Sequence, residues 1–316
     1  MKTSRFLLRR TGTAGFLSRT FHAARRGDRH ASILKVGPQD PVARRFSKRI
    51  QSFRRESAAY KLLQPFAGKV VPKCLASFSN SDGSDGLLWL DKIEPARSGN
   101  QLAGLSWKEL VATVRSIGTV HARFWSARKP THLHHLPFQR YNLAHETEPR
   151  LRGFRKYCRG LLQPKDEGVL LTIPDVISRA LRECRHRPST LLHGDLRADN
   201  LLFSRGRVFL VDWQIAAWGL GTFDLARVIG GSSQRPLRLS EQQKLVRIWH
   251  QTLKEGGVRK YTLEEAWQDY RVGVALTLSI PITNGPTLAR LSPRGKKIAR
   301  LMIRRFFRNG REFGLL

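Results

Sequence analysis

The fold of this chain is decided by residues 191–203, with the sequence LLHGDLRADNLLF, and residues 208–213, with the sequence VFLVDW. Both segments contain runs of strand-forming apolar residues. The four residues 204–207 between them, Ser-Arg-Gly-Arg, form a short polar stretch with a glycine, which is typical of a hairpin turn. The sequence therefore predicts two short antiparallel strands that begin and end in polar residues.

The polar residues at the open end of this hairpin are the candidate metal ligands. A hairpin folded symmetrically about Gly206 places Asn200 opposite Asp212. An amide oxygen and a carboxylate that meet there, beside the carboxylate of Asp195, suit an oxygen-preferring cation such as Mg²⁺. The spacing therefore predicts a magnesium site formed by Asn200 and Asp212.

These residue types form the catalytic half of a phosphoryl-transfer site. Such chemistry requires positioning and charge neutralisation more than covalent catalysis by the protein. Asp195 is expected to orient the attacking hydroxyl and accept its proton, while Asn200 and Asp212 hold the metal against nucleotide phosphates. In the alternative interpretation, His-Gly-Asp is only a turn and Asp212 only a cap at the end of a strand. Each residue alone is commonplace, so the prediction depends on their combination.

The same motifs resemble those of a known family. The HGD sequence at 193–195, Asn200 and the VDWQ sequence at 211–214 are similar to the aminoglycoside phosphotransferase and choline kinase superfamily. That superfamily shares the two-lobed architecture of protein kinases. The nearest resemblance is to the ecdysteroid-kinase-like branch and its bacterial relatives, through VHARFW at 120–125 and WGLGTFDLA at 218–226.

The resemblance implies an α+β, protein-kinase-like fold with two lobes. Residues 1–94 would form the N-lobe, a small antiparallel sheet with one helix that carries the nucleotide loop, the lysine strand and the hinge strand. Residues 95–316 would form a larger, mainly helical C-lobe with the catalytic loop and the metal-binding hairpin. A chain of 316 residues, 41% of them hydrophobic, is long enough for two such bodies.

A buried lysine–glutamate pair is predicted in the N-lobe. Residues 31–36 read as an apolar strand that carries Lys35, and residues 46–63 have the apolar spacing of one helix face. Glu56 lies on that face, so it can pair with Lys35 and hold it for nucleotide phosphates, a role that the resemblance also implies. The alternative is a surface lysine and a solvated glutamate. The apolar positions of the face are Phe46, Ile50, Phe53 and Tyr60.

Two backbone sites for the nucleotide follow from the kinase-like arrangement. Residues 12–18 contain Gly12 and Gly15, and small residues there let backbone amides approach phosphates. A glycine pair alone is more often a simple turn, and only its place before the lysine strand favours a nucleotide loop. Asp91 and Ile93 follow the last N-lobe strand and form the predicted hinge, whose backbone contacts adenine.

The second lobe is predicted to be mostly helical. Capping boxes at 106–109 and 262–265 mark the beginnings of two amphipathic helices. A further helix is expected from Ser240, and a basic amphipathic helix over 295–307. The basic face of that last helix is expected to be solvated, with a membrane or RNA surface as the alternative.

The charge of the chain is extreme, with 57 basic and 24 acidic residues and a net charge of +33. Such a field attracts anions in general, including nucleotides and nucleic acids. The basic residues are scattered, and no nucleic-acid reader motif occurs. A basic nucleic-acid-binding protein is therefore an alternative interpretation, and the net charge is its only support.

Composition also bears on the compartment. The three cysteines have no metal or disulfide spacing, which favours a reducing environment and the cytoplasm. No acidic residue precedes Asp28, so an organelle presequence is the alternative interpretation of the N-terminal segment. The longest apolar run, over 272–282, is too short to cross a bilayer, and no transmembrane segment is predicted.

Together these observations predict an ATP- and Mg²⁺-dependent small-molecule kinase, which transfers the γ-phosphoryl group to a substrate hydroxyl. Asp195 is the predicted catalytic residue, and Asn200 and Asp212 are the metal ligands. His193 and Asp224 are expected to shape the catalytic loop. The other alternative is a catalytically inactive kinase-like protein that binds nucleotide. The sequence leaves open the acceptor, apart from a mild preference for an anionic molecule, and the oligomeric state.

Overall fold

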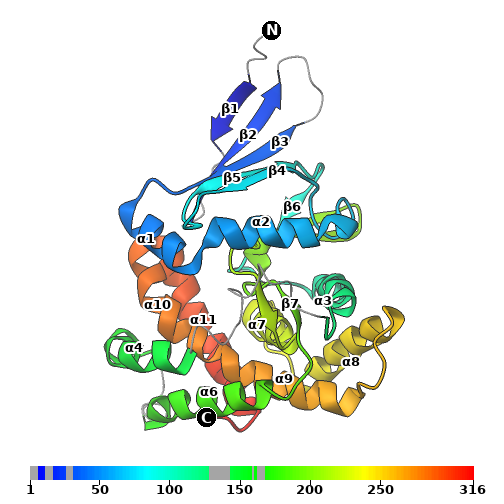
Figure 1. The fold of residues 1–316 in the computed structure, drawn as a ribbon. Helices are drawn as coiled ribbons and strands as arrows, with labels where there is room; N and C mark the ends of the chain where they lie inside the picture. Colours follow the sequence, from blue (N-terminus) through cyan, green and yellow to red (C-terminus); the bar gives the residue numbers. More distant parts are fainter. Residues whose placement is uncertain (1–5, 11–16, 26–30, 128–142, 159, 162–167) are drawn as a thin grey trace. The chain divides into compact units, whose positions relative to one another are not determined.

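The chain, seen in a computed structural model, forms two compact units (Figure 1). The structure describes residues 6–10, 17–25, 31–127, 143–158, 160–161 and 168–316. Unit 1 comprises Met1–Arg97 and Asn200–Ala216, and unit 2 comprises Ser98–Asp199 and Ala217–Leu316. The hairpin of the predicted metal site therefore groups with the N-terminal residues by its contacts. The division of the sequence into lobes 1–94 and 95–316 stays a prediction, since contact-defined units need not follow one cut in the chain.

Unit 1 contains a five-stranded antiparallel sheet, with strand order β1-β2-β3-β5-β4. Lys35 lies on the central strand β3, opposite Leu88 of β5 and Thr20 of β2, and is buried. The loop between β4 and β5 is closed by the Asn80 N–H, which donates to the Asp85 carbonyl at 3.0 Å. The strands are β1 (Phe6–Arg10), β2 (Arg19–Arg25), β3 (Ser32–Val36), β4 (Cys74–Ser79) and β5 (Gly86–Asp91).

The helical segment after β3 differs from the sequence prediction, because it is two helices rather than one. Helix α1 (Pro41–Ile50) ends at Gln51, whose φ of 56° is left-handed, and α2 (Ser52–Leu62) begins directly after it. The Phe53 N–H donates to the carbonyl of Gly83 at 3.1 Å, so a loop of the sheet provides the acceptor that a continuous helix would have supplied. Helix α2 packs against β4 and β5. The predicted inward face is nevertheless buried at Ile50, Phe53, Glu56 and Tyr60.

The predicted hairpin is present in unit 1 as β8 (Leu201–Ser204) and β9 (Arg207–Leu210). Its turn has two residues, Arg205 and Gly206, with φ of 47° and 76°. The centre of the hairpin therefore lies between Arg205 and Gly206. The predicted centre at Gly206 is wrong. Leu201 pairs with Leu210, and Asn200 faces Val211 instead of Asp212.

Unit 2 is mainly helical, as the sequence predicts. Both capping boxes form, at Ser106 with Glu109 and at Thr262 with Glu265. Strands β7 (Thr190–Leu192) and β10 (Ala217–Gly219) pair antiparallel beside the helices. The helices are α3 (Trp107–Arg123), α4 (Leu143–Cys158), α6 (Ile173–Cys184), α7 (Thr222–Ser232), α8 (Leu239–Glu255), α9 (Leu263–Thr277), α10 (Ser279–Leu291) and α11 (Pro293–Glu312).

Short elements complete the two units. Strand β6 (Arg97–Ser98) and the 3-10 helix η5 (Ala198–Asn200) lie where the chain passes between units. Two further 3-10 helices are η1 (Gln64–Phe66) in unit 1 and η4 (Leu170–Thr172) in unit 2. The mixed composition of the elements, with an antiparallel sheet in the N-terminal part and helices in the C-terminal part, agrees with the predicted α+β class.

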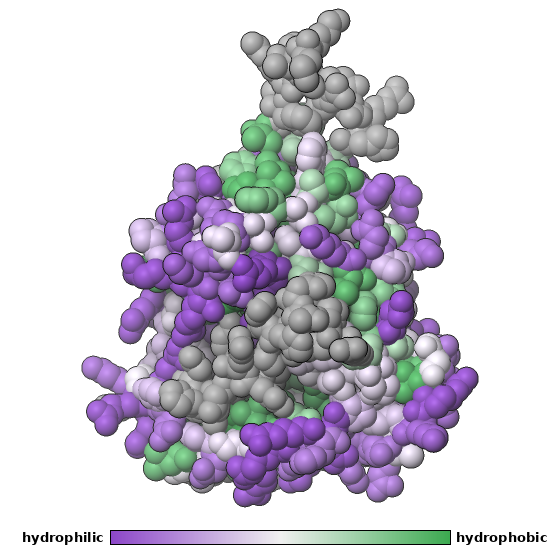
Figure 2. All heavy atoms as spheres, in the orientation of Figure 1, coloured by the Kyte–Doolittle hydropathy of each residue, from purple (hydrophilic) through white to green (hydrophobic). Residues whose placement is uncertain are grey.

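One helical stretch of the described chain, Leu263–Leu291, is long and apolar enough to cross a membrane by composition. However, 67% of its apolar window is buried inside the protein, as in a core helix, so it is weak support for a span. On the face shown in Figure 2, hydrophilic side chains predominate, and hydrophobic ones gather over the sheet of unit 1.

Candidate active site

Lys35 of β3 lies between two carboxylates of unit 1. Its Nζ is 2.9 Å from Oε1 and 2.8 Å from Oε2 of Glu56 on α2, and 2.7 Å from Oδ1 of Asp212. Lys35 and Glu56 are buried, and the Asp212 side chain is 35% exposed. The predicted contact between Lys35 and Glu56 is therefore present, and Asp212 joins it after β9.

Burial and charge act against each other in this cluster. Burial raises the pKa of Glu56 to about 7, although the Lys35 ammonium partly offsets that effect. Burial alone would lower the pKa of Lys35, but the carboxylates of Asp212 and Glu56 outweigh it and raise that pKa. Lys35 is therefore held in its charged form, with its ammonium beside the partly exposed carboxylate of Asp212.

Gln214 is a member of this cluster that the sequence did not single out, although it lies in the VDWQ motif. With its amide oriented to satisfy both neighbours, the oxygen accepts from Lys35 Nζ at 3.0 Å and the nitrogen donates to Asp212 Oδ1 at 3.2 Å. Gln214 is buried, so these contacts compensate the cost of removing its amide from water. It lies two residues after Asp212, and this short spacing was the one available signal in the sequence.

The predicted metal ligands both belong to the hairpin of unit 1. The carbonyl of Asn200 accepts from the Val211 N–H at 3.0 Å, and Asn200 is buried. Asp212 has a left-handed φ of 69°, which is uncommon for a residue with a side chain and often marks a functional position. Asp212, two residues after the end of β9, thus departs from the extended backbone of that strand.

Asn200 and Asp212 suit a Mg²⁺ ion that is bound together with a phosphate ligand. They are too few to hold a metal that is coordinated by protein side chains alone. Among the described residues, no group of three or more His, Cys, Asp or Glu side chains could hold a metal. Mg²⁺ is commonly bound by one or two protein carboxylates with substrate phosphates and water. One amide and one carboxylate, Asn200 and Asp212, are an incomplete set that nucleotide phosphates would complete.

Asp195 lies in unit 2, after β7, and both of its carboxylate oxygens contact arginines. Oδ1 accepts from Arg227 Nη2 at 2.5 Å and Nε at 3.2 Å, and Oδ2 accepts from Arg197 Nε at 3.1 Å. Burial alone would raise the pKa of Asp195, but the guanidinium groups of Arg227 and Arg197 hold it well below its usual range. Arg227, on α7, was not predicted from the sequence, because an arginine inside an apolar helix gives no sign of its partner.

Asp224 at the beginning of α7 fastens the loop that carries Asp195. Its Oδ2 accepts from the His193 N–H at 2.7 Å, and its Oδ1 accepts from the Gly194 N–H at 2.9 Å. Gly194 has a φ of 82°, a conformation that favours glycine. His121 lies 3.4 Å from Asp224 and accepts from Trp249 Nε1 at 3.1 Å. These contacts fix the backbone of His193 and Gly194, and the role of Asp224 in shaping the catalytic loop stays a prediction.

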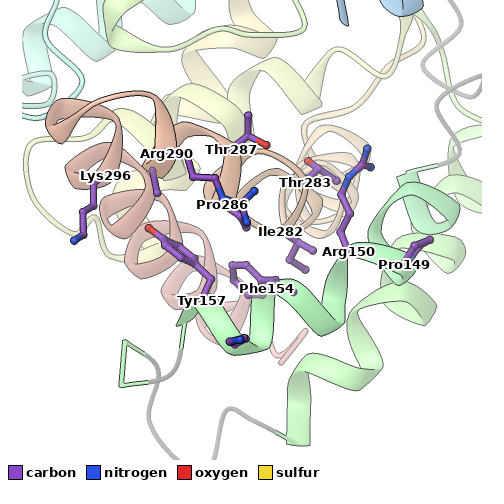
Figure 3. A pocket seen from close by; sticks show the side chains of 13 residues that line it. Pro149, Arg150, Phe154, Tyr157, Ile282, Thr283, Pro286, Thr287, Arg290 and Lys296 are labelled. Carbon is purple, nitrogen blue, oxygen red and sulfur yellow. The ribbon is translucent and has the colours of Figure 1, made fainter. Parts of the chain in front are cut away.

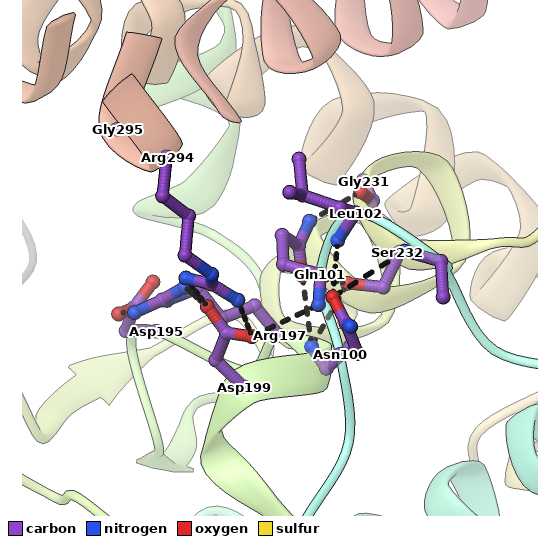
Figure 4. A network of polar contacts seen from close by, with 12 residues as sticks. Asn100, Gln101, Leu102, Asp195, Arg197, Asp199, Gly231, Ser232, Arg294 and Gly295 are labelled. Atoms are coloured by element: carbon purple, nitrogen blue, oxygen red, sulfur yellow. Dashed lines mark hydrogen bonds and ion pairs between the residues drawn. The ribbon is translucent and has the colours of Figure 1, made fainter. Parts of the chain in front are cut away.

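A polar network extends from this loop to the beginning of α11 (Figure 4). Arg197 Nη1 donates to Asp199 Oδ2 at 2.6 Å, and both oxygens of Asp199 also accept from Arg294, at 2.8 and 3.0 Å. The Gln101 N–H donates to Asp199 at 2.9 Å, and its side-chain oxygen accepts from the Ala198 N–H at 3.0 Å. The residues that follow Asp195 are therefore fixed to two other parts of unit 2.

The structure describes only one of the two predicted backbone sites for the nucleotide, the hinge. Gly12 and Gly15 lie outside the described residues. Asp91 ends β5, and its N–H donates to the Lys73 carbonyl at 2.9 Å, while Ile93 follows the sheet. The contacts of Asp91 and Ile93 with adenine stay a prediction.

The structure thus forms two clusters from the predicted residues. Unit 1 brings together Lys35 and Glu56 with Asp212, and its hairpin carries Asn200. Unit 2 brings together His193, Asp195 and Asp224. The convergence of Asp195 with Asn200 and Asp212 on one ion stays a prediction.

Residues 13–258 match the APH family, which is described as the phosphotransferase enzyme family. The match covers most of the chain, and this protein belongs to that family. The search of curated proteins finds no match.

Solved structures share the fold at low sequence identity. Choline kinase from Cryptosporidium parvum Iowa II is 12% identical, with a TM-score of 0.63, over 98% of this chain and 91% of that chain. Aminoglycoside phosphotransferase APH(2'')-Ib with ADP is 16% identical, with a TM-score of 0.55, over 96% and 94% of the two chains. A microcompartment-associated aminopropanol kinase is 16% identical, with a TM-score of 0.57, over 98% and 94%. The predicted superfamily and α+β fold class are confirmed, while the ecdysteroid-kinase-like branch stays a prediction.

Proposed function

We propose that this protein is a small-molecule kinase that uses ATP and Mg²⁺ to phosphorylate a hydroxyl group. The observation that carries the proposal is the charged Lys35, held between the buried Glu56 and the partly exposed Asp212. A lysine fixed in this way can bind nucleotide phosphates when Asp212 engages a metal instead. Two solved relatives are named as complexes with ADP or with AMP-PNP and Ca²⁺, which supports nucleotide use here.

In this proposal, each of these residues has a separate role in phosphoryl transfer. Lys35 neutralises phosphate charge, and Asn200 and Asp212 are the residues that would hold Mg²⁺. When bound, the metal supplies positive charge that offsets the charge developing during transfer. Asp195 orients the acceptor hydroxyl and receives its proton after the bond to phosphorus has largely formed. Its low pKa suits orientation more than early proton removal.

Mg-ATP binding is the first test. Wild-type protein is expected to show a rise in melting temperature with Mg-ATP, and Asp212→Ala is expected to lose that rise because a metal ligand and a partner of Lys35 are both removed. Asp175→Ala, which removes an exposed carboxylate on α6, is the matched control and should keep it. Equal thermal shifts in both variants would remove Asp212 from the nucleotide site.

Turnover separates the proposed kinase from an inactive nucleotide-binding protein. ADP release is measured across a panel of hydroxylated metabolites, with wild type and Asp195→Asn. Loss of a positioned carboxylate is expected to lower turnover by roughly 10²–10⁴-fold. Mg-ATP binding without ADP release for any acceptor would favour the inactive alternative.

We also propose a reducing, cytoplasmic location, since all three cysteines are free thiols. Fluorescence microscopy of the tagged full chain tests it, and accumulation in an organelle would contradict it.

A further inference from the structure

A pocket of unit 2 lies apart from the residues discussed so far. It has a volume of about 540 Å³ and is lined by α4, α10 and the beginning of α11 (Figure 3). The rings of Phe154 and Tyr157 point from α4 toward α10, where Ile282 and Pro286 complete an apolar wall. This volume lies within the range of about 300–1,000 Å³ that is common for small-molecule sites.

The charged side chains that line this pocket are all basic. They come from all three helices: Arg150, Lys156, Arg290 and Lys296. The lining contains no Asp or Glu, and α10 contains no acidic residue at all. Within the described residues, no carboxylate forms an ion pair with Lys156, Arg290 or Lys296. Like charges around one cavity repel each other, and a bound anion would relieve that repulsion.

A hydrogen-bond donor is also available at this pocket. The Tyr157 hydroxyl is buried and has no hydrogen-bond partner within the described residues. Burial raises the pKa of Tyr157, so the phenol stays protonated and keeps its donor. A buried hydroxyl without a partner is costly, and an acceptor oxygen of a ligand would satisfy it.

Helix α11 contributes both to the pocket, through Lys296, and to the polar network of the Asp195 loop, through Arg294. Arg294, two residues before Lys296, forms the ion pair with Asp199. Arg197 in turn bonds both Asp199 and Asp195. The high net charge of the chain explains neither the apolar wall nor the shared helix α11. These two features distinguish the pocket from the basic residues scattered over the surface.

We propose that this pocket binds the acceptor, and that the acceptor is an anionic small molecule with a free hydroxyl and an apolar or aromatic portion. This inference rests on the proposed kinase function. The basic side chains would pair with a carboxylate or phosphate group, Tyr157 would donate to it, and the aromatic wall would contact the apolar portion. Cationic molecules such as choline would be repelled by the same four side chains.

The test compares four probes that share one scaffold: 4-(hydroxymethyl)benzoate, 4-(hydroxymethyl)phenyl phosphate, 4-(hydroxymethyl)benzamide and 4-(hydroxymethyl)benzylamine. Binding to the full chain is measured directly by titration calorimetry, without nucleotide. At least one anionic probe is expected to bind about tenfold or more tightly than the neutral amide, and the amine least. The order of the first two probes shows whether a carboxylate or a phosphate is preferred.

Charge reversal locates this preference in the pocket. Both Arg290 and Lys296 are exposed, so Arg290→Glu with Lys296→Glu should fold, which circular dichroism checks. This double variant is expected to lose the preference for the anion. The control is Lys254→Glu with Arg259→Glu, an equal charge change at exposed positions outside the pocket, and it should keep the preference.

The outcomes separate this inference from the proposed function. Equal binding of anionic, neutral and cationic probes, or an unchanged preference in the pocket variant, would overturn the inference. Neither result affects the thermal shift with Mg-ATP, which reports on unit 1. Absence of that thermal shift in wild type would overturn the proposed function, while the calorimetric preference would still decide which ligand the pocket takes.

Discussion

At the scale of single residues, Asp195 is distinguished by its two arginine partners. Arg227 and Arg197 occupy both carboxylate oxygens, so in the proposed mechanism an acceptor hydroxyl displaces or shares one of these contacts. The same guanidinium groups keep the carboxylate ionised to low pH. Asp195 is therefore ready to accept a hydrogen bond but is a weak base, which agrees with chemistry that depends more on positioning than on proton removal.

Replacing Arg227 should change the pH dependence of catalysis. Arg227 is the main charge that lowers the pKa of Asp195, and the proposed mechanism requires the ionised carboxylate. In Arg227→Gln that pKa rises, so the acidic limb of the kcat profile should move to higher pH. The measurement is kcat against pH for both proteins. A limb that stays in place would show that Arg227 does not control the ionisation of Asp195.

Glu56 should make the stability of the protein depend on pH below neutrality. Its folded pKa of about 7 exceeds the ordinary carboxyl value of 4.5, so between these values the folded state binds more protons than the unfolded state. The contribution of Glu56 to stability therefore decreases as pH rises from about 4.5 to 7. Glu56→Gln should remove this slope from a plot of melting temperature against pH. An identical slope in both proteins would contradict the assignment.

At the scale of elements, the β8–β9 hairpin shows how a turn sets the positions of site residues. A two-residue turn with positive φ at both positions matches the twist of the flanking strands. It shifts the partner of Asn200 to Val211, so Asp212 lies beyond the paired region and is free to turn toward Lys35. The sequence identified the hairpin correctly, but its symmetry depends on the turn type.

Gly206 is the position where this turn can be tested. Its φ is 76°, and a Cβ atom added there would meet nothing within 4 Å, so any cost of substitution comes from the backbone alone. Gly206→Val should lower the free energy of unfolding by about 1–2 kcal/mol. Chemical denaturation measures the change, and Arg205→Asn, which tolerates positive φ, serves as the comparison. An unchanged midpoint in Gly206→Val would contradict the turn geometry.

For the helices, the sequence pattern predicted the buried faces correctly. It did not predict the point at which one helix ends and the next begins. Capping boxes located the beginnings of α3 and α9, because the cap and its partner lie three residues apart and need no distant contact. The break at Gln51 was missed because its cause, the bond from Phe53 to Gly83, joins residues that are far apart in the sequence.

At the scale of the whole molecule, the net charge of +33 should produce non-specific binding to nucleic acid. That binding should weaken steeply with salt, because it depends on the release of counterions. A protein with about 6–10 phosphate contacts loses roughly 10³–10⁵-fold in affinity between about 50 and 200 mM salt. Fluorescence anisotropy with RNA of random and fixed sequence measures this. Tight, sequence-dependent binding at high salt would instead favour the nucleic-acid-binding alternative.

The sequence by itself determined the family, the α+β class, the hairpin and the pairing of Lys35 with Glu56. Each of these depends on local spacing or on a motif of consecutive residues, and such information is present in the chain order. Only the tertiary structure placed Gln214 beside Lys35, Arg227 on Asp195 and a basic pocket between α4 and α10. The partners of a buried charge come from distant segments, and they are chosen by packing, desolvation and electrostatics, which no periodicity records.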